Sequence, residues 1–185
     1  MTRITAGRYR GRQLQTPVGN VTRPTSERVR EALANALVAA GGLEGGRVLD
    51  LYAGSGALGL ELLSRGADSL VLVEQDRAAL AALRANIATL QVPNVQVVPS
   101  DVRTFAGSSV GRPFDFVIAD PPYHVLTPEL QDIFAALRAG GHLNPGADLI
   151  VERSRRGGDM MWPEPLLAVR TKKYGDTLLC YGRAP

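Results

Sequence analysis

The amino-acid sequence predicts an α/β fold in which a mostly parallel β-sheet is covered by helices on both faces. From Arg47 onward, short apolar runs alternate with stretches whose apolar residues recur at helical spacing. Near-continuous apolar strands separated by helices are typical of a parallel sheet that is buried on both sides. A glycine-rich turn also follows the first apolar run, at the position where such sheets bind ligands.

The expected strands and helices alternate along the chain. Strands are expected at RVLDLY (47–52), SLVLVEQ (69–75), VQVVPSD (95–101), FDFVIAD (114–120) and DLIVERS (148–154). Helices are expected at GALGLELLSRG (56–66), RAALAALRANIATL (77–90) and TPELQDIFAALRAG (127–140). Two further β-like runs, LLAVRTKKYGD (166–176) and TLLCYGR (177–183), meet at a Gly-Asp pair. We expect them to form a closing hairpin that places an antiparallel strand on the sheet.

The segment before the first strand has a different pattern. Residues 3–18, RITAGRYRGRQLQTPV, alternate apolar or aromatic with basic residues and contain two glycines, which predicts a short β-hairpin or an extended arm. Residues 23–40, RPTSERVREALANALVAA, have apolar residues at helical spacing and Glu27 in the first turn, which predicts a helix. We therefore divide the chain into a basic arm, residues 1–22, and a main domain, residues 23–185.

The composition favours a single domain. At 185 residues with 45% hydrophobic content, the chain can bury one sizeable core. No apolar run approaches the ~18 residues of a membrane span, and the first residues lack the apolar stretch of a secretory signal. The lone Cys180 excludes an intrachain disulfide, and one Cys with two His offers too few ligands for a buried metal cluster. We expect a cytoplasmic monomer without a metal.

Positive charge is concentrated near the N-terminus. The first thirty residues contain seven arginines and a single acid, Glu27. Such a cluster suits contact with the phosphates of a nucleic acid, although charge alone is equally compatible with a solvated arm. The residues expected to contact nucleic acid are Arg3, Arg8, Arg10, Arg12 and Arg23.

The glycine-rich turn lies in LDLYAGSGALGLE (49–61) and has the G-x-G-x-x-G spacing of a cofactor-binding loop. Asp50 distinguishes two cofactor classes. A dinucleotide would place its pyrophosphate at the following helix N-terminus, where the Asp50 carboxylate would repel it. S-adenosylmethionine carries no phosphate but has a cationic sulfonium and a cationic ammonium. Asp50 therefore favours S-adenosylmethionine, either directly or through water.

Acidic residues also follow the next two strands. Glu74 is placed to accept hydrogen bonds from both ribose hydroxyls of a cofactor. Asp101 is placed to bind the adenine amino group, with Val102 beside the ring, and a helix N-cap is the alternative role for Asp101. The residues expected to bind the cofactor are Asp50, Tyr52, Ala53, Gly54, Ser55, Gly56, Gly59, Glu74, Gln75, Asp101, Val102 and Asp120.

The fourth strand runs into Asp120, Pro121, Pro122 and Tyr123. In a doubly wound sheet this strand lies beside the first, so Asp120 opens into the same crevice as the glycine loop. The exocyclic amino group of a nucleobase is a weak nucleophile because its lone pair is delocalised into the ring.

The Asp120 carboxylate and the Pro121 carbonyl can accept the two hydrogens of such an amino group, and the prolines add no competing N–H. Tyr123 can stack on the base. The segment therefore predicts a clamp for an amino group beside a methyl donor. Its target base must be single-stranded, looped or flipped out.

Taken together, these segments resemble the small class I methyltransferases that modify the 2-amino group of one guanine in bacterial 16S ribosomal RNA. The resemblance covers the arm, RPTSERVREALANAL (23–37), VLDLYAGSGALGLELLSRGA (48–67), DPPY (120–123) and KKYGDT (172–177). It implies a Rossmann-like fold with a seven-stranded sheet and S-adenosylmethionine as donor, with S-adenosylhomocysteine as the product. It also implies that residues 120–123 are the catalytic segment.

The resemblance further implies that Arg23 and Thr25 close over the methionine end of the cofactor or over the RNA. The implied partner is 16S ribosomal RNA, either free or in a partly assembled small subunit. The family usually has an aromatic residue where this chain has Ala34, which we interpret as a packing variation.

Three other functions are weaker interpretations of the same residues. A DNA adenine methyltransferase usually needs a target-recognition insertion, for which the core strands leave no room. A nicotinamide-dependent oxidoreductase is disfavoured by Asp50 and by the lack of a substrate domain. A non-catalytic RNA-binding module would not need the acids at four strand ends. Trp162 is expected to be a packing residue, and residues 152–158, ERSRRGG, to form a solvated loop.

Overall fold

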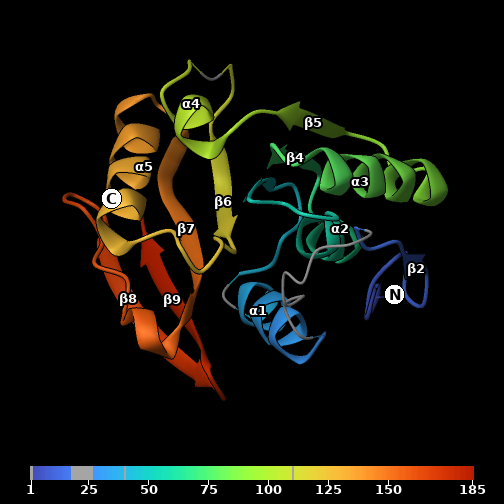
Figure 1. The fold of residues 1–185 in the computed structure, drawn as a ribbon, viewed down its shortest axis with the longest axis horizontal. Helices are drawn as coiled ribbons and strands as arrows, with labels where there is room; N and C mark the ends of the chain where they lie inside the picture. The colour runs from blue at the N-terminus through green and yellow to red at the C-terminus, as the bar shows by residue number, and fades with distance from the viewer. Residues whose placement is uncertain (1, 18–26, 40, 110) are drawn as a thin grey trace.

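The computed structural model describes residues 2–17, 27–39, 41–109 and 111–185. Within these ranges the chain forms a two-stranded sheet and a seven-stranded sheet, with helices on both faces of the larger one (Figure 1). The predicted α/β fold is confirmed. No helix in the described part of the chain is long and apolar enough to cross a membrane.

The large sheet has the strand order β5-β4-β3-β6-β7-β9-β8. Its strands are β3 (Arg47–Leu51), β4 (Ser69–Glu74), β5 (Val95–Pro99), β6 (Phe114–Ala119), β7 (Leu143–Ser154), β8 (Leu167–Tyr174) and β9 (Thr177–Arg183). The five strands from β5 to β7 are parallel, and β9 runs antiparallel to both β7 and β8. The predicted closing hairpin is therefore correct, and its strand β8 forms one edge of the sheet, opposite β5.

The strand order reverses at β3. The chain proceeds outward from β3 to β4 and β5, and then returns to β6 on the other side of β3. Leu51, the last residue of β3, pairs with Val73 of β4 and with Ala119 of β6. The loops that follow β3, β4 and β6 therefore leave the sheet at one edge, where ligands bind in doubly wound folds.

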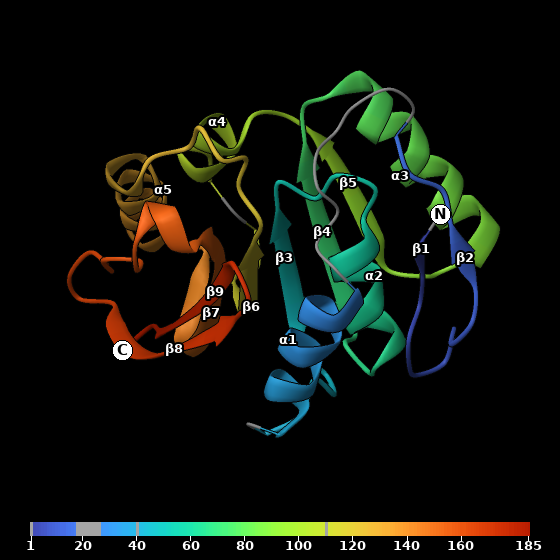
Figure 2. The ribbon, with the colours of Figure 1, turned by 60° about the horizontal axis from the view of Figure 1, so that its bottom comes forward.

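Helices cover the two faces of the sheet as separate layers (Figures 1 and 2). The helices are α1 (Glu27–Ala39), α2 (Ala57–Ser64), α3 (Arg77–Leu90), α4 (Val102–Ala106) and α5 (Thr127–Ala139). Leu70 and Leu72 of β4 pack in a core with α1, α2 and α3. Val71 and Val73 point the other way, into a core with α4 and α5, because successive strand residues face opposite sides.

The N-terminal arm forms the predicted hairpin. Its strands β1 (Thr2–Arg3) and β2 (Gln13–Leu14) pair antiparallel and lie beside α2 and α3 (Figure 2). Ile4 and Leu14 are fully buried in the same core as α1, α2 and α3. The domain boundary expected at residue 22 lies outside the described residues.

Two elements differ from the prediction. Helix α4 has only five residues, which is too short for a helical period to be visible in the sequence. Strand β7 begins at Leu143 rather than at residue 148, and a shift in register between Phe114 and Phe116 accommodates the extra length. The sequence did not predict this extension, because the added segment contains a proline and a glycine, which are uncommon inside strands.

Candidate active site

The glycine loop joins β3 to α2, and its three glycines meet different requirements. Gly54 has a φ of 56°, and a Cβ there would meet no atom of the described residues within 4 Å. Gly56 has a φ of 79°, and a Cβ there would lie 2.4 Å from Cδ1 of Leu83. A Cβ on Gly59 would lie 2.8 Å from Oδ2 of Asp50. Gly54 therefore leaves its backbone open to approach, while the other two let α2 pack closely.

Asp50 lies beneath this loop. It is 1% exposed, and its Oδ2 accepts a hydrogen bond from the Gly59 N–H at 2.9 Å. Burial raises the pKa of Asp50 well above the ordinary carboxyl range, and the charges of Asp120 and Glu74 raise it further, against the opposing effect of the Gly59 hydrogen bond. The carboxyl group thus fixes the start of α2 from the interior.

The raised pKa of Asp50 predicts a pH dependence. A carboxyl group that prefers to be neutral in the folded state stabilises the fold fully below its unfolded pKa of about 4. That contribution is lost as the pH rises through the folded pKa. The unfolding free energy of Asp50→Asn minus that of wild type should therefore increase as the pH is raised from about 3 to about 8. Urea unfolding across this range tests it, and a difference that does not vary with pH would contradict it.

Glu74, the last residue of β4, connects its strand to the glycine loop. Its Oε2 accepts from the Gly54 N–H at 2.8 Å, and its Oε1 accepts from the Gln75 and Asp76 N–H groups, both at 2.8 Å. Three charge-assisted hydrogen bonds fix the carboxylate at the junction of two loops. Glu74 and Gln75 therefore lie next to the glycine loop, as the sequence indicates.

Asp101 is the N-cap of α4, which was the alternative role considered for it. Its Oδ1 accepts from the Thr104 N–H at 2.9 Å. Hydrogen bonds from Thr104 lower the pKa of Asp101, so the group is ionised at neutral pH. Val102 is 5% exposed and belongs to the core beside α5, which leaves little of its side chain for contact with a ring.

The remaining loop residues lie between β3 and α2. Tyr52 has a φ of 62°, and burial raises its pKa to about 12. The Ala53 N–H donates to the Val73 carbonyl at 3.0 Å. The Ser55 carbonyl accepts from the side chain of Asn86 at 2.9 Å. Contacts from β4 and α3 therefore hold the loop on two sides.

The Asp-Pro-Pro-Tyr segment leaves β6 at the same edge of the sheet. Pro121 is buried, whereas Pro122 and Tyr123 are exposed, and 71% of Tyr123 is accessible. The Val125 N–H donates to the Pro122 carbonyl at 2.9 Å, which closes a turn around Tyr123. An exposed aromatic ring on a closed turn is available for stacking.

The structure brings Asp120 next to the glycine loop. Ala119, which precedes it, pairs with Leu51 at the end of β3. The carboxylate is also near enough to raise the pKa of Asp50. The sheet edge thus gathers three acids, at positions 50, 74 and 120, around one loop.

The arm presents its basic side chains to solvent. The exposed arginines are Arg3, Arg8, Arg10 and Arg12. Arg23 and Thr25, expected to close over the site, lie outside the described residues.

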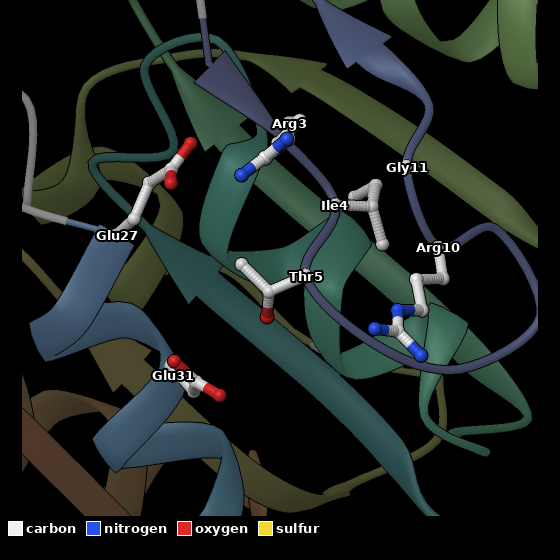
Figure 3. A pocket seen from close by; sticks show the side chains of 7 residues that line it. All are labelled: Arg3, Ile4, Thr5, Arg10, Gly11, Glu27 and Glu31. Atoms are coloured by element: carbon white, nitrogen blue, oxygen red, sulfur yellow. The ribbon is translucent and has the colours of Figure 1, made fainter.

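A cavity of about 300 Å³ separates the arm from α1 (Figure 3). It is lined by Arg3, Ile4, Thr5, Arg10, Gly11, Glu27 and Glu31. In Figure 3 the side chain of Arg3 points toward Glu27, so acids of α1 face part of the arm's positive charge. Arg8 and Arg12 are not among the lining residues described.

Sequence reasoning missed Asn86, which connects the arm to the glycine loop. Asn86 is 1% exposed; its Oδ1 accepts from the Gln15 N–H at 2.7 Å, and its Nδ2 donates to the carbonyls of Gln15 and Ser55. A signal was present, because Asn86 lies in the apolar stripe of α3 between Leu83 and Leu90.

Arg153 of β7 was also missed as a candidate, because the expectation of a solvated loop at residues 152–158 is wrong for residues 152–154, which end β7 and include the buried Arg153. It is 8% exposed, and its guanidinium donates to the Val125 carbonyl at 2.8 Å and to the Thr127 hydroxyl at 3.2 Å. Within DLIVERS it shares the strand face of Leu149 and Val151. A charged residue on an otherwise apolar strand face is the sequence feature that could have identified it.

Trp162 and His142 have structural contacts. Trp162 packs edge-on against Phe134, with ring centroids 5.1 Å apart, which confirms the predicted packing role. His142 is fully buried, with Nε2 2.8 Å from the Ser108 carbonyl oxygen. No group of three or more His, Cys, Asp or Glu side chains in the described ranges could hold a metal ion.

The fold and the site define a class of protein. A seven-stranded sheet with one antiparallel strand, a glycine loop after the first strand of the main domain and Asp-Pro-Pro-Tyr after the fourth are the features of a Rossmann-like methyltransferase. A solved structure described as "Putative methyltransferase yhhF from Escherichia coli" superimposes with a TM-score of 0.85 at 36% identity, and covers 100% of this chain and 98% of that one.

The chain belongs to the family described as Conserved hypothetical protein 95, whose model matches residues 2–183. It is 40% identical over 156 residues to Ribosomal RNA small subunit methyltransferase D of Escherichia coli strain K12, covering 84% of this chain and 76% of the relative. It is 33% identical over 176 residues to the protein of that name from Haemophilus influenzae, covering 94% and 89%. The chain is therefore an enzyme of the methyltransferase type that the sequence resembles.

Proposed function

We propose that the protein transfers a methyl group from S-adenosylmethionine to the 2-amino group of one guanine in 16S ribosomal RNA. The observation that carries this proposal is the position of Asp120 to Tyr123 beside the glycine loop, at the reversal point of the sheet. The relatives named as small-subunit ribosomal RNA methyltransferases support the choice of RNA.

The residues around the loop fit S-adenosylmethionine, which when bound supplies an electrophilic methyl group. The open face of Gly54 permits close approach to the backbone. Glu74 already accepts three backbone hydrogen bonds, so its carboxylate keeps about one acceptor site for a ribose hydroxyl beside that glycine. The burial of Asp50 favours an indirect contact, through water or through the loop, with the cationic end of the cofactor. Asp101, exposed enough to remain ionised, would accept from the adenine amino group.

At the acceptor end, the Asp120 carboxylate and the Pro121 carbonyl would hold the guanine amino group while Tyr123 stacks on the extruded base. Holding the nitrogen in line with the methyl group supplies most of the acceleration, of the order of several kcal/mol. No strong base is required, because the methylated amino nitrogen is transiently cationic and loses its proton readily. In this proposal the Asp120 carboxylate would receive that proton.

Transfer of labelled methyl from S-adenosylmethionine tests the function. The substrates are 16S ribosomal RNA, small-subunit particles stripped of this methyl group, and duplex DNA, and digestion to nucleosides identifies the product. We expect 2-methylguanosine from RNA, and the comparison of free RNA with particles identifies the assembly state of the substrate. Methylated adenine, label on DNA alone, or no label at all would each refute the proposal.

The arm is proposed to bind RNA backbone. Arg8 and Arg12 are the sharpest test, because they are exposed and do not line the cavity that contains Glu27 and Glu31. Arg8→Ala with Arg12→Ala should weaken RNA binding about tenfold at low salt and reduce the salt dependence of binding by about two counterions. Filter binding over a salt series measures both. If the salt dependence of binding is unchanged, these arginines do not contact RNA phosphates and the arm is a solvated surface.

A further inference from the structure

We infer that Arg153 is a positioning residue for methyl transfer, because its guanidinium fixes the turn that carries Tyr123. The inference rests on the proposed function, in which Tyr123 stacks on the target base. It concerns β7, a strand that the proposed chemistry does not otherwise use.

The contacts of Arg153 fall on the chain directly after the Asp-Pro-Pro-Tyr segment. Nη1 donates to the Val125 carbonyl at 2.8 Å and Nη2 donates to the Thr127 hydroxyl at 3.2 Å. These two acceptors flank Leu126, at the entrance to α5. One rigid guanidinium fork therefore holds two points of the same segment, which a flexible ammonium could not do equally well.

The turn needs such support because its functional side chain is not packed. Tyr123 is 71% exposed, so burial does not fix its ring. The turn is anchored at its start, where Asp120 follows β6, and at its end, where Val125 is 3% exposed and donates to the Pro122 carbonyl. Arg153 holds the carbonyl of that same Val125, so it fixes the end of the turn.

The burial of Arg153 is unfavourable in itself. Among the described residues the structure records no ion pair for Arg153, and its Nε has no hydrogen-bond partner. Burial lowers the pKa of the guanidinium. Desolvating a cation without a carboxylate is costly, so the two hydrogen bonds to the turn are the compensation that the structure shows. Gly157 provides the space, since a Cβ there would lie 3.0 Å from Nη2.

A positioning role is separable from a purely structural one. If Arg153 only stabilised the fold, its loss would lower thermal stability and weaken the binding of S-adenosylmethionine and of RNA together. If it positions Tyr123, its loss should reduce kcat while the Michaelis constant for S-adenosylmethionine stays the same, because the glycine loop lies on other elements. A small displacement of an orienting group can cost about 100-fold in rate.

The experiment compares the full-length wild type with Arg153→Met, Arg153→Lys and Thr127→Val. We expect Arg153→Met to lower kcat about 10- to 100-fold, while the Michaelis constant for S-adenosylmethionine stays within about twofold of the wild-type value. Arg153→Lys should recover part of the rate, because one donor can still reach the turn. Thr127→Val, which removes one acceptor and keeps the charge, should lower kcat about threefold. Arg138→Met, an exposed arginine near the C-terminus of α5, is the matched control and should match wild type.

Hydrogen exchange gives a readout that does not depend on activity. In Arg153→Met, exchange should quicken in the peptide covering residues 120–127 and remain unchanged in β3 and α2. An unchanged kcat with unchanged exchange at 120–127 would overturn the inference, as would faster exchange throughout the protein. If wild type transfers no methyl group to RNA, the proposed function fails, and the exchange result still decides whether Arg153 fixes the turn.

Discussion

Asp120→Ala should reduce methyl transfer by about 10²- to 10³-fold while the affinity for S-adenosylmethionine changes by less than about threefold. The expected loss is large because this carboxylate is the charged acceptor that would hold the amino nitrogen, and removal of one such preorganised group typically costs 10²–10³ in rate. Cofactor affinity should persist because the loop keeps the hydrogen bond from the Gly54 N–H to the Glu74 carboxylate. Single-turnover transfer and calorimetric titration of the cofactor measure the two effects separately.

Two companion variants make this result interpretable. Asp120→Asn keeps one acceptor oxygen and the shape of the side chain, so it should retain more activity than Asp120→Ala. Asp132→Ala removes an exposed carboxylate from α5 and should behave as wild type. Turnover near the normal level in Asp120→Ala would exclude the proposed role of the carboxylate.

The sequence predicted those parts of the fold that depend on local period and on chain order. Apolar runs located the strands of the main sheet, and the reversal rule placed β6 beside β3, as the pairing of Leu51 with Ala119 confirms. The rule works because right-handed crossovers leave few ways to order parallel strands. The same rule predicted that Asp120 would open into the same crevice as the glycine loop.

The sequence did not predict which groups form hydrogen bonds with the buried polar side chains. Asn86, Arg153 and Glu61 each interrupt an apolar face, so the pattern could have marked them as unusual. Their partners, however, lie 71, 28 and 56 residues away in the chain. Only the folded structure brings such pairs together, and no local period carries that information. For Asp50, the apolar run correctly predicted a position near the end of β3, but it did not predict the burial of the carboxyl group.

Glu61→Ala should cause the largest loss of stability in the chain. Glu61 lies in α2 and is fully buried; its carboxylate accepts from the Thr5 N–H at 2.8 Å, the Thr5 hydroxyl at 2.6 Å and the Ala6 N–H at 3.1 Å. It also accepts from Nε of Arg65 at 2.8 Å. One carboxylate therefore holds the backbone of the arm on the main domain.

Arg30 of α1 makes the substitution more costly. Its side chain is 2% exposed and pairs with Glu61 at 3.7 Å, while Nη1 and Nη2 donate to the Thr2 hydroxyl and the Arg3 carbonyl. The ion pair is too long for a hydrogen bond, so its contribution is electrostatic. Removal of Glu61 would take the larger of two carboxylate attractions from the buried Arg30 cation and leave only that of Glu27, and breaking a buried pair typically costs about 3–5 kcal/mol. For a chain of this size that corresponds to a fall in Tm of roughly 10 °C or more.

A double-mutant cycle with Arg30→Met tests this explanation. If Arg30 is the stranded cation, Glu61→Ala should cost clearly less in the Arg30→Met background than in wild type. Glu44→Ala, at an exposed position, should leave Tm unchanged. Hydrogen exchange in residues 2–16 should quicken in Glu61→Ala more than exchange in β3 to β6, because the arm loses its attachment while the sheet keeps its own core. Equal costs in both backgrounds would show that Glu61 stabilises the protein through Thr5, Ala6 and Arg65, independently of Arg30.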